Sequence, residues 1–522
     1  MKKITLVNLF LILASALYAQ NVEDAVRFSD QIFLGSARNQ GIGGSGSSLG
    51  GDMSSVYSNP AGIGMYKTNE FSLSPTFTLL NNKFNYGGTN ASSRKNSLPF
   101  GTSGFVFGKT NEYDPRKSSA FALTFNRTGN YNNNTEYRGF NNVSSFTEQY
   151  LEQVTRELSG TPENIVKGLE NNYIFGASLA YYSFLIDTIT DPDGFKVQSL
   201  VPLARNNGAG GINQYNRIMT QGGNTELGFA YALSSNDKFN FGFSIGIPIY
   251  NYERNQTYRE EDATDDTNND FNYFEYKEKY TTKGVGFNAK LGVIVRPQPN
   301  VRLGLAVHTP TFASLKDRVS SSITADTEGY TTRPQPITTT SADLIGDNEI
   351  AGNYEYTLKT PMKFIIGGSY IFGAVKDVKQ QKGFINADLE IVNHAGTRYT
   401  KAENGSFDDE VYYNGLNDLI KNTYKTAVNF KLGGEMKFNT LMARAGFGYY
   451  GSPYKIKDLG GERLLGSLGI GYRHGGYFID FAITQMFFKR GNVPYYLNDK
   501  PSPIADGKLS QTMASITFGT KF

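Results

Sequence analysis

The 522-residue sequence contains no cysteine and no tryptophan, and it has only three histidines. The absence of cysteine excludes disulfides, thiolate metal sites, iron–sulfur clusters, a cysteine nucleophile and a lipid-modified N-terminal cysteine. An excess of one charge is also missing, because 51 basic residues nearly balance 48 acidic ones. The sequence therefore does not favour nucleic-acid binding. We expect neither a cofactor nor a resident metal.

Long apolar runs are almost absent. The one such run, residues 4–19, follows Lys2 and Lys3 and ends with a small residue, Ala19. A basic start, a short apolar core and a small final residue are typical of a cleavable signal peptide. The run is shorter than the ~20 residues that a membrane helix needs. We therefore assign residues 1–19 to a signal peptide, and the exported chain is either soluble or a β-barrel.

Glycine, phenylalanine and tyrosine are abundant, with 57, 37 and 34 residues, and the aromatic residues fall into alternating patterns. Every second residue is apolar in residues 71–79, and the same alternation returns in 239–249, 301–307, 385–391, 477–483 and 514–522. A soluble β-sandwich would also alternate, but these runs approach the ~9–11 residues of a tilted membrane strand. We predict an all-β transmembrane barrel in which Phe239, Phe241, Phe243 and Ile245 face lipid.

Short and long connections alternate between these runs. The short ones lie near 110–117, 234–237, 297–300, 375–382, 438–440 and 475–476. The long ones lie near 81–97, 131–212, 251–270, 318–350, 400–424, 452–463 and 490–510. Outer-membrane barrels have short periplasmic turns, long extracellular loops and an even number of strands. Thirteen connections predict fourteen antiparallel strands over residues 70–522, with both chain ends in the periplasm.

The loop predicted for residues 131–212 has helical patterns. Apolar residues from Phe146 to Leu158 recur at helical spacing, and Pro162 can start a second helix. We expect this partly helical loop to fold over the barrel mouth. Two roles stay open for it, packing on the barrel rim and contact with a ligand.

Residues 20–69 precede the barrel and are mostly small and uncharged. Gly41, Gly43 and Gly46 match a dinucleotide-binding pattern, but the βαβ unit that this motif requires is missing. Small side chains permit close backbone approach, and Asn59-Pro60 favours a fixed turn. We predict that this segment packs inside the lumen as a hatch.

The residues just described resemble the FadL/TodX family of outer-membrane transporters for long-chain fatty acids and hydrocarbons. The resemblance rests on the glycine-rich stretch 37–51, on residues 54–62 with Asn59-Pro60-Ala61, and on the run into the first strand at Phe71. It implies a fourteen-stranded barrel in a Gram-negative outer membrane and passive uptake of hydrophobic compounds. The implied hatch residues are Gly41, Gly43, Gly44, Asn59, Pro60 and Ala61.

The same resemblance implies that ligand leaves through a gap in the barrel wall, made by an inward kink of the third strand. Residues 120–130 correspond to that strand. The C-terminal Phe522 is typical of barrels inserted by the outer-membrane assembly machinery. We expect that machinery, outer-membrane lipid and a hydrophobic small molecule as partners of a monomeric protein.

Four inward-facing cations are candidates for binding a ligand carboxylate, since a carboxylate favours charge-assisted hydrogen bonds. They are Arg302, Lys431, Arg444 and Arg473. The alternative is that they pair inside the lumen with acidic residues that also point inward, namely Asp388, Glu390, Glu435 and Asp480.

Two other classes of function were weighed. A hydrolase needs a nucleophile with a partner base, and only His308 and His394 could face the lumen, with no nucleophile at fixed spacing. We therefore expect a protein that is not an enzyme. A surface adhesin or structural barrel would have long loops, but it would not need a glycine-rich hatch.

Overall fold

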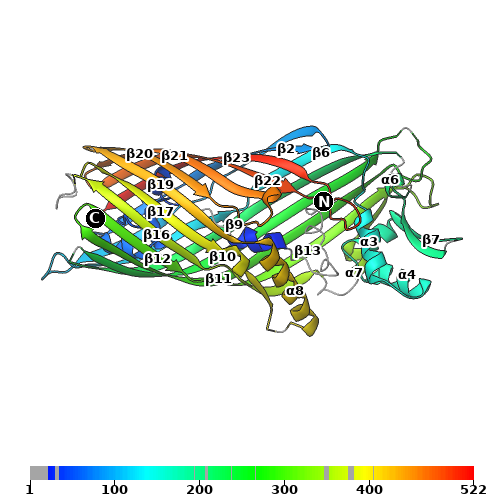
Figure 1. Cartoon of the computed structure of the whole chain (residues 1–522), viewed down its shortest axis with the longest axis horizontal. Helices are drawn as coiled ribbons and strands as arrows, with labels where there is room; N and C mark the ends of the chain where they lie inside the picture. Colours follow the sequence, from blue (N-terminus) through cyan, green and yellow to red (C-terminus); the bar gives the residue numbers. More distant parts are fainter. Residues whose placement is uncertain are drawn as a thin grey trace.

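The computed structural model describes residues 22–29, 34–192, 194–205, 210–236, 238–264, 266–345, 352–373, 381–403 and 405–522. The predicted signal peptide, residues 1–19, lies outside these ranges. The described chain forms a long, closed antiparallel barrel with short turns at one end and long connections with helices at the other (Figure 1). None of the described helices combines the length and the apolar character needed to cross a membrane.

The barrel wall contains fourteen strands in the described residues. Eight are continuous: β9 (Ile212–Ser235), β10 (Phe239–Asp262), β11 (Tyr273–Gln298), β19 (Thr426–Phe438), β20 (Leu441–Tyr450), β21 (Gly460–His474), β22 (Tyr477–Asn492) and β23 (Ala505–Lys521). Six are interrupted once: β1 (Glu70–Leu73) with β2 (Thr76–Tyr86), β3 (Thr89–Ser97) with β4 (Ser103–Thr110), β5 (Ser118–Asn130) with β6 (Asn133–Asn141), β12 (Val301–His308) with β13 (Phe312–Asp326), β15 (Asn353–Lys359) with β16 (Lys363–Phe372), and β17 (Gly383–Asn393) with β18 (Arg398–Lys401). Pairing of β23 with β1 and β2 closes the barrel, which confirms the predicted fold class and strand number.

The outward face near the short-turn end is apolar. Phe239, Phe241 and Phe243 on β10 are exposed, and the residues between them are buried. Ile245 on the same face is half-buried. Alternation of this kind is the pattern of a strand whose outer face contacts lipid. The predicted orientation of β10 is confirmed.

The strands are longer than the sequence predicts, so all seven expected long loops include strand residues, and two of them are mostly strand. Residues 81–97 form most of a hairpin, in which β2 and β3 are joined by Gly87 and Gly88 with φ of 53° and 79°. Residues 251–262 continue β10. Beyond the lipid band the outward residues of β10 are polar. A strand predicted from apolar alternation therefore ends before the real strand does. The inward residues Tyr252 and Tyr258 continue the pattern and are buried.

The remaining elements lie in the long connections. The loop predicted for 131–212 begins after β6, because residues 133–141 still pair with β9. It contains α3 (Glu148–Glu157), α4 (Pro162–Asn171), α5 (Ala177–Tyr182), the hairpin β7 (Ile186–Asp191) and β8 (Gly194–Ser199), and α6 (Pro202–Arg205). Other connections hold β14 (Ile337–Thr340), α7 (Ser341–Ile345), η5 (His394–Gly396), α8 (Phe407–Thr423) and η6 (Lys457–Leu459).

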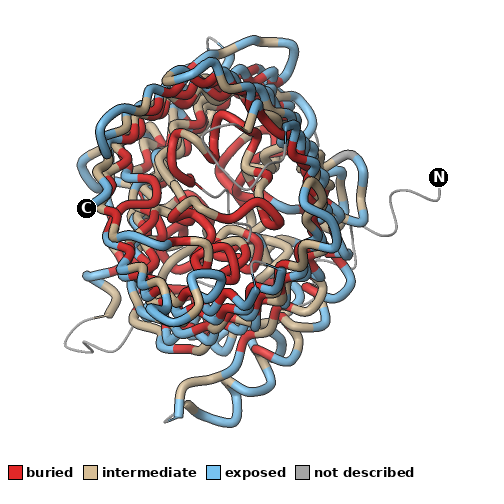
Figure 2. Tube along the Cα trace, turned by 90° about the vertical axis from the view of Figure 1, so that its left-hand side faces the viewer, coloured by how far each residue is buried: buried red, intermediate tan, exposed pale blue. Residues whose placement is uncertain are grey.

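The chain ahead of the barrel lies inside the lumen. Its elements are α1 (Val22–Ser29), α2 (Ala37–Gly41), η2 (Met53–Val56) and η3 (Pro60–Met65). Viewed along the barrel, this buried chain crosses the interior (Figure 2). Helix α2 packs against β21 and β22, and η3 packs against β9 and β10 on another side of the lumen. We call residues 34–66 the lumenal segment.

Candidate functional site

A cavity of about 750 Å³ lies between the lumenal segment and the long connections. Helix α1 lines it together with α8, the chain just before α5, and the inner faces of β2, β9, β10, β22 and β23. Most of its surface is apolar or aromatic, including Leu80, Phe84, Tyr454 and Phe488. A cavity of this size and lining suits a small, largely apolar molecule.

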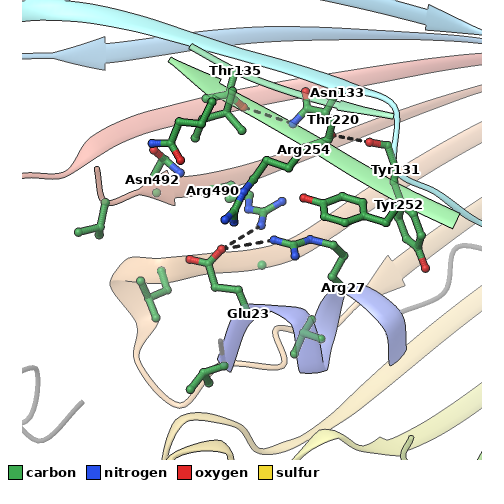
Figure 3. A pocket seen from close by; sticks show the side chains of 18 of the residues that line it. Glu23, Arg27, Tyr131, Asn133, Thr135, Thr220, Tyr252, Arg254, Arg490 and Asn492 are labelled. Atoms are coloured by element: carbon green, nitrogen blue, oxygen red, sulfur yellow. Dashed lines mark hydrogen bonds and ion pairs between the residues drawn. The ribbon is translucent and has the colours of Figure 1, made fainter. Parts of the chain in front are cut away.

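One wall of the cavity carries a cluster of charges on α1 and the strands facing it (Figure 3). The Glu23 carboxylate lies 3.8 Å from a guanidinium nitrogen of Arg27 and 3.9 Å from one of Arg490. The side chains of Glu23 and Arg490 are 46% and 47% exposed, so this ion pair faces the open cavity. Arg254, beside them, is paired with Glu278.

Aromatic side chains hold α1 in place. Phe28 makes edge contacts with Tyr131, Tyr250 and Tyr252, with ring centroids 5.8 to 6.0 Å apart. The hydroxyl of Tyr424 donates a hydrogen bond to the carbonyl oxygen of Val22 at 2.7 Å. The buried Asp24 also accepts a hydrogen bond from the Tyr280 hydroxyl at 3.3 Å. Because aromatic pairs of this geometry add to the free energy of burial, Phe28 is the main apolar anchor of α1.

The lumenal segment packs against the inner face of the wall and contains every predicted hatch residue. The Asn59 side chain accepts a hydrogen bond from the Ala61 amide at 3.2 Å and donates to the carbonyl oxygen of Ser47 at 2.7 Å. Asn59 also donates to the Val293 carbonyl of β11 at 3.2 Å, and therefore joins two parts of the segment to the wall. Pro60 follows as the first residue of η3, where its fixed φ suits a helix start.

The predicted glycines allow the segment to approach the wall closely. At Gly43, which has a φ of +71°, an added Cβ would lie 2.8 Å from the Phe447 amide nitrogen of β20. At Gly41 it would lie 3.3 Å from the Gly469 Cα of β21. Gly44 has a φ of +72°, a conformation that favours glycine. The structure thus brings all six predicted hatch residues into the lumenal segment.

The four predicted carboxylate-binding cations lie elsewhere than in the cavity. Arg444 donates to Glu435 and to Asp480, at 2.7 Å in each case. Lys431 lies 3.2 Å from Glu390, and Arg473 lies 3.9 Å from Asp480. The Arg302 guanidinium donates to the carbonyl oxygen of Leu49 in the lumenal segment. Pairing inside the lumen, the alternative noted from the sequence, is thus seen for Arg444, Lys431 and Arg473.

These ion pairs also bind the lumenal segment. Arg38 of α2 donates to Glu435 at 3.2 Å, beside the Arg444 contact. The Asp388 carboxylate accepts hydrogen bonds from the Gly46 and Ser47 amides at 2.8 and 3.0 Å. Buried carboxylates that accept several donors hold their partners firmly. The inward charges therefore fix the segment to the wall.

The cations of the cavity were missed by the sequence analysis. They are the four arginines Arg27, Arg254, Arg463 and Arg490, and the lining also includes Lys489, whose side chain lies on the outward-facing side of β22. Arg254 and Arg490 lie in strand residues that the sequence analysis assigned to loops, and Arg27 lies on a helix ahead of the barrel. The inward alternation of Tyr252, Arg254 and Tyr258 was the available signal, because it continues the pattern of β10 past the lipid band.

The barrel wall is interrupted beside the cavity. The ladder between β4 and β5 ends at Ser103 and Phe125. Beyond it, β3 is paired with β2 and β6 is paired with β9, and no ladder joins β3 to β6 in the described residues. A register shift between Arg127 and Gly129 bends β5 at this height. This irregularity lies within the third strand, where the resemblance implies a kink that sequence reasoning could not place.

Side chains bridge the interruption, which we call the seam. Asn130 donates to Thr78 and to Ser97, at 3.2 and 3.0 Å. Asn82 donates to Asn133 at 2.6 Å, and Ser93 donates to the carbonyl oxygen of Asn134. One backbone hydrogen bond, from the Arg127 amide to the Phe100 carbonyl, crosses at the lower end. Residues 129–133 of the seam line the cavity on its inner side.

The long loop covers the other end of the lumen. The buried Glu260 carboxylate accepts hydrogen bonds from the Ser145 hydroxyl, the Phe146 amide, the Gln214 side chain and the Tyr258 hydroxyl, at 2.6 to 2.8 Å. These contacts attach the start of the loop to β10. The described residues contain no group of three or more His, Asp or Glu side chains placed to hold a metal ion.

No family model matches the sequence, and no curated protein matches it. The solved structures that match it over nearly their full lengths include the following two. A FadL homologue from Pseudomonas aeruginosa has 12% identity and a TM-score of 0.54, with 95% of this chain and 100% of that chain covered. The toluene transporter TodX from P. putida has 12% identity and a TM-score of 0.53, with 94% and 99% covered. The resemblance suggested by the sequence is therefore confirmed at the level of the fold, which is the closed fourteen-stranded barrel that this chain shares with the FadL homologue and TodX.

Proposed function

We propose that this chain is an outer-membrane channel for the passive uptake of hydrophobic compounds such as long-chain fatty acids or hydrocarbons. A closed barrel with an outward apolar band and long loops at one end is the design of a Gram-negative outer-membrane protein. The matched structures are a FadL homologue and a toluene transporter. The proposed channel carries out no chemical reaction, so it is not an enzyme.

The observation that carries this proposal is the position of the cavity. The cavity lies directly inside the seam, and the lumenal segment closes the barrel beneath it. A molecule that enters from the loop end therefore meets an apolar chamber whose nearest side exit is the wall interruption. On the outer side of the seam, Leu98 and Phe100 are exposed on the barrel surface. The proposed route runs from the cavity through the seam into the membrane.

The lining suits an amphiphile. Burial of a hydrocarbon chain gains about 0.8 kcal/mol per CH₂, so no external energy source is needed for binding. Arg490 is placed to take a ligand carboxylate, because its present partner, Glu23, is a half-exposed side chain. A neutral hydrocarbon would contact only the apolar and aromatic side chains of the cavity.

In this proposal residues 20–69 form the hatch. The buried lumenal segment and its contacts at Asn59 and Gly43 support that role. Without the hatch, the lumen of a barrel of fourteen strands would be a water-filled passage. A deletion of residues 22–66 that keeps the signal peptide should leave a barrel that conducts small ions in planar bilayers.

The seam gives the most direct test. The chain has no cysteine, so Ser97→Cys with Asn130→Cys introduces a single pair of thiols across the seam. Joining them with a short thiol-reactive cross-linker should abolish uptake of a fatty acid or a hydrocarbon by cells, and a cleavable cross-linker should restore it. The control is Leu468→Cys with Ile483→Cys, which are register partners in the intact ladder of β21 and β22.

Two outcomes would reject parts of this proposal. Unchanged uptake after complete cross-linking would reject the seam as the exit. Silent bilayers with the deleted barrel, together with normal uptake, would reject the hatch and favour an adhesin or structural barrel. For assembly, Phe522 at the end of the last strand is the proposed signal for the barrel assembly machinery, and the protein is proposed to act as a monomer.

A further inference from the structure

Three exposed lysines lie in a row on the outer surface of the barrel. They are Lys489 on β22, Lys508 on β23 and Lys83 on β2. Lys489 is the register partner of Lys508, and Lys508 is the register partner of Lys83. Directly opposed side chains in an antiparallel sheet have Cβ atoms about 4.5–5.5 Å apart, and like charges at that separation destabilise the pair.

The described part of the chain contributes little negative charge to neutralise this row. Among the described residues, none of the three lysines forms an ion pair within 4 Å. On the short-turn side, the neighbouring outward positions are Phe487, Ser510 and Asn81, and Asn81 is the register partner of the exposed Arg94. On the loop side, Asp506 is the neighbouring carboxylate on these strands, and the exposed Glu462 on β21 lies at the level of Lys489. Four cations thus face two carboxylates.

Two exposed lysines on another part of the barrel have carboxylate partners. Lys316 on β13 lies 2.9 Å from Glu355, on the neighbouring strand β15. Lys277 on β11 lies 2.6 Å from Glu275. The row on β22, β23 and β2 differs from these two lysines, because its lysines have no carboxylate of the described residues at contact distance.

The row lies at the loop-side edge of the lipid band. On β22 the exposed apolar residues run from Tyr477 to Phe487, and Lys489 is the next outward residue. Ten residues of strand rise about 33 Å, and a tilt of about 40° reduces this to roughly 25 Å along the membrane normal. That height equals the apolar band of an outer-membrane barrel. Long loops mark the extracellular end, so the row is level with the headgroups of the outer leaflet.

We propose that Lys83, Lys489 and Lys508, with Arg94 beside them, form a binding site for the phosphate groups of an outer-leaflet lipid. Basic clusters at a membrane surface attract anionic headgroups, and phosphate oxygens form charge-assisted hydrogen bonds with lysine. A headgroup with two phosphates can reach neighbouring lysines of the row at once. This site lies outside the barrel, and it does not depend on the uptake route.

The test uses the complete folded barrel in detergent with diphosphoryl lipid A as the probe. Native mass spectrometry should show lipid bound to the parent. The variant Lys83→Gln with Lys489→Gln and Lys508→Gln should bind at least tenfold less. The matched control is Lys109→Gln with Arg116→Gln and Lys117→Gln, which removes three exposed cations at the short-turn end. The control should bind like the parent.

Two comparisons make the proposal specific. Monophosphoryl lipid A should bind more weakly than the diphosphoryl form, and millimolar inorganic phosphate should not displace the lipid. Equal loss in both triple variants, equal binding of the two lipids, or displacement by inorganic phosphate would overturn the site. If the triple glutamine variant does not fold, the single change Lys508→Glu should still reduce binding severalfold, and parent-level binding by this variant would reject the proposal.

Discussion

The lumenal segment and helix α1 occupy the same barrel but are held in different ways. The lumenal segment is attached by buried charges, with Arg38 and Arg444 both bonded to Glu435. It also has backbone amides bonded to Asp388. Helix α1 has one buried carboxylate, Asp24, which pairs with Arg27 of the same helix and accepts a hydrogen bond from Tyr280 at 3.3 Å. Its main contact with the wall is the ring of Phe28, and its Glu23 faces the cavity with partners nearly 4 Å away. Buried networks are costly to break, whereas exposed ion pairs contribute little.

This difference suggests that the two parts of the N-terminal region have different roles. The lumenal segment would stay fixed in the barrel, because separating its ion pairs leaves charges unpaired in a buried site. Helix α1 would serve as the adjustable part, because its half-exposed Glu23 can exchange partners with a ligand or with water. The two parts should therefore respond to mutation on different scales.

The largest expected effect on stability is at the buried ion pairs that hold the lumenal segment. Arg444→Ala leaves Glu435 and Asp480 buried without their shared partner, which should cost about 3 to 5 kcal/mol. The measurement is the free energy of unfolding of the refolded barrel in denaturant. Arg490→Ala is the control, since its carboxylate partner is half-exposed. Equal losses of unfolding free energy in the two variants would contradict the proposed difference between the lumenal segment and α1.

The next effect is expected at the anchor of α1. Phe28→Ala removes a fully buried ring from a tyrosine cluster, and such changes cost about 3 kcal/mol or more in a packed core. We expect the loss to appear as undocking of α1 rather than unfolding of the barrel. Hydrogen exchange should increase in residues 22–29 and stay unchanged in residues 34–66. Increased exchange in both regions would show that they unfold as one unit.

A smaller effect is expected at the turn of the lumenal segment. Asn59→Ala removes the cap of η3 and the donor to the Ser47 carbonyl, at a cost of about 1 to 3 kcal/mol. Uptake of a hydrophobic ligand should fall more than the protein level does. Ser58→Ala, at a half-buried neighbouring position, is the control. Loss of protein in proportion to uptake would indicate a purely structural role.

The smallest effect on stability is expected at Glu23. Glu23→Gln removes the charge from an ion pair that is nearly half-exposed, so the free energy of unfolding should change by about 1 kcal/mol or less. The same change should strengthen binding of a fatty acid, because the ligand no longer competes with Glu23 for Arg490. Binding of a neutral hydrocarbon should stay the same. A parallel change for both ligands would argue against competition at Arg490.

Some features were predictable because they follow from local patterns. Outward Phe239 and Phe241, with polar residues between them, reveal a strand against lipid, since side chains alternate between the two faces. The alternation of short and long connections gave the strand number. The ends of the strands were not predictable in the same way. Once β2 and β10 leave the lipid band their outward residues are polar, and only the inward tyrosines still mark a strand.

The sequence by itself determined the fold class, a transmembrane β-barrel. A strand that crosses the membrane must place an apolar residue at every second position, because one of its faces contacts lipid. The sequence also determined that a small, turn-rich segment precedes the barrel. Only the tertiary structure decided which cations meet which partners. Arg444 lies opposite Glu435 and near Asp480 because of strand register, and Arg490 meets Glu23 across 467 residues of chain. Contacts of that kind depend on barrel closure, and closure is a property of the whole sheet that no local pattern contains.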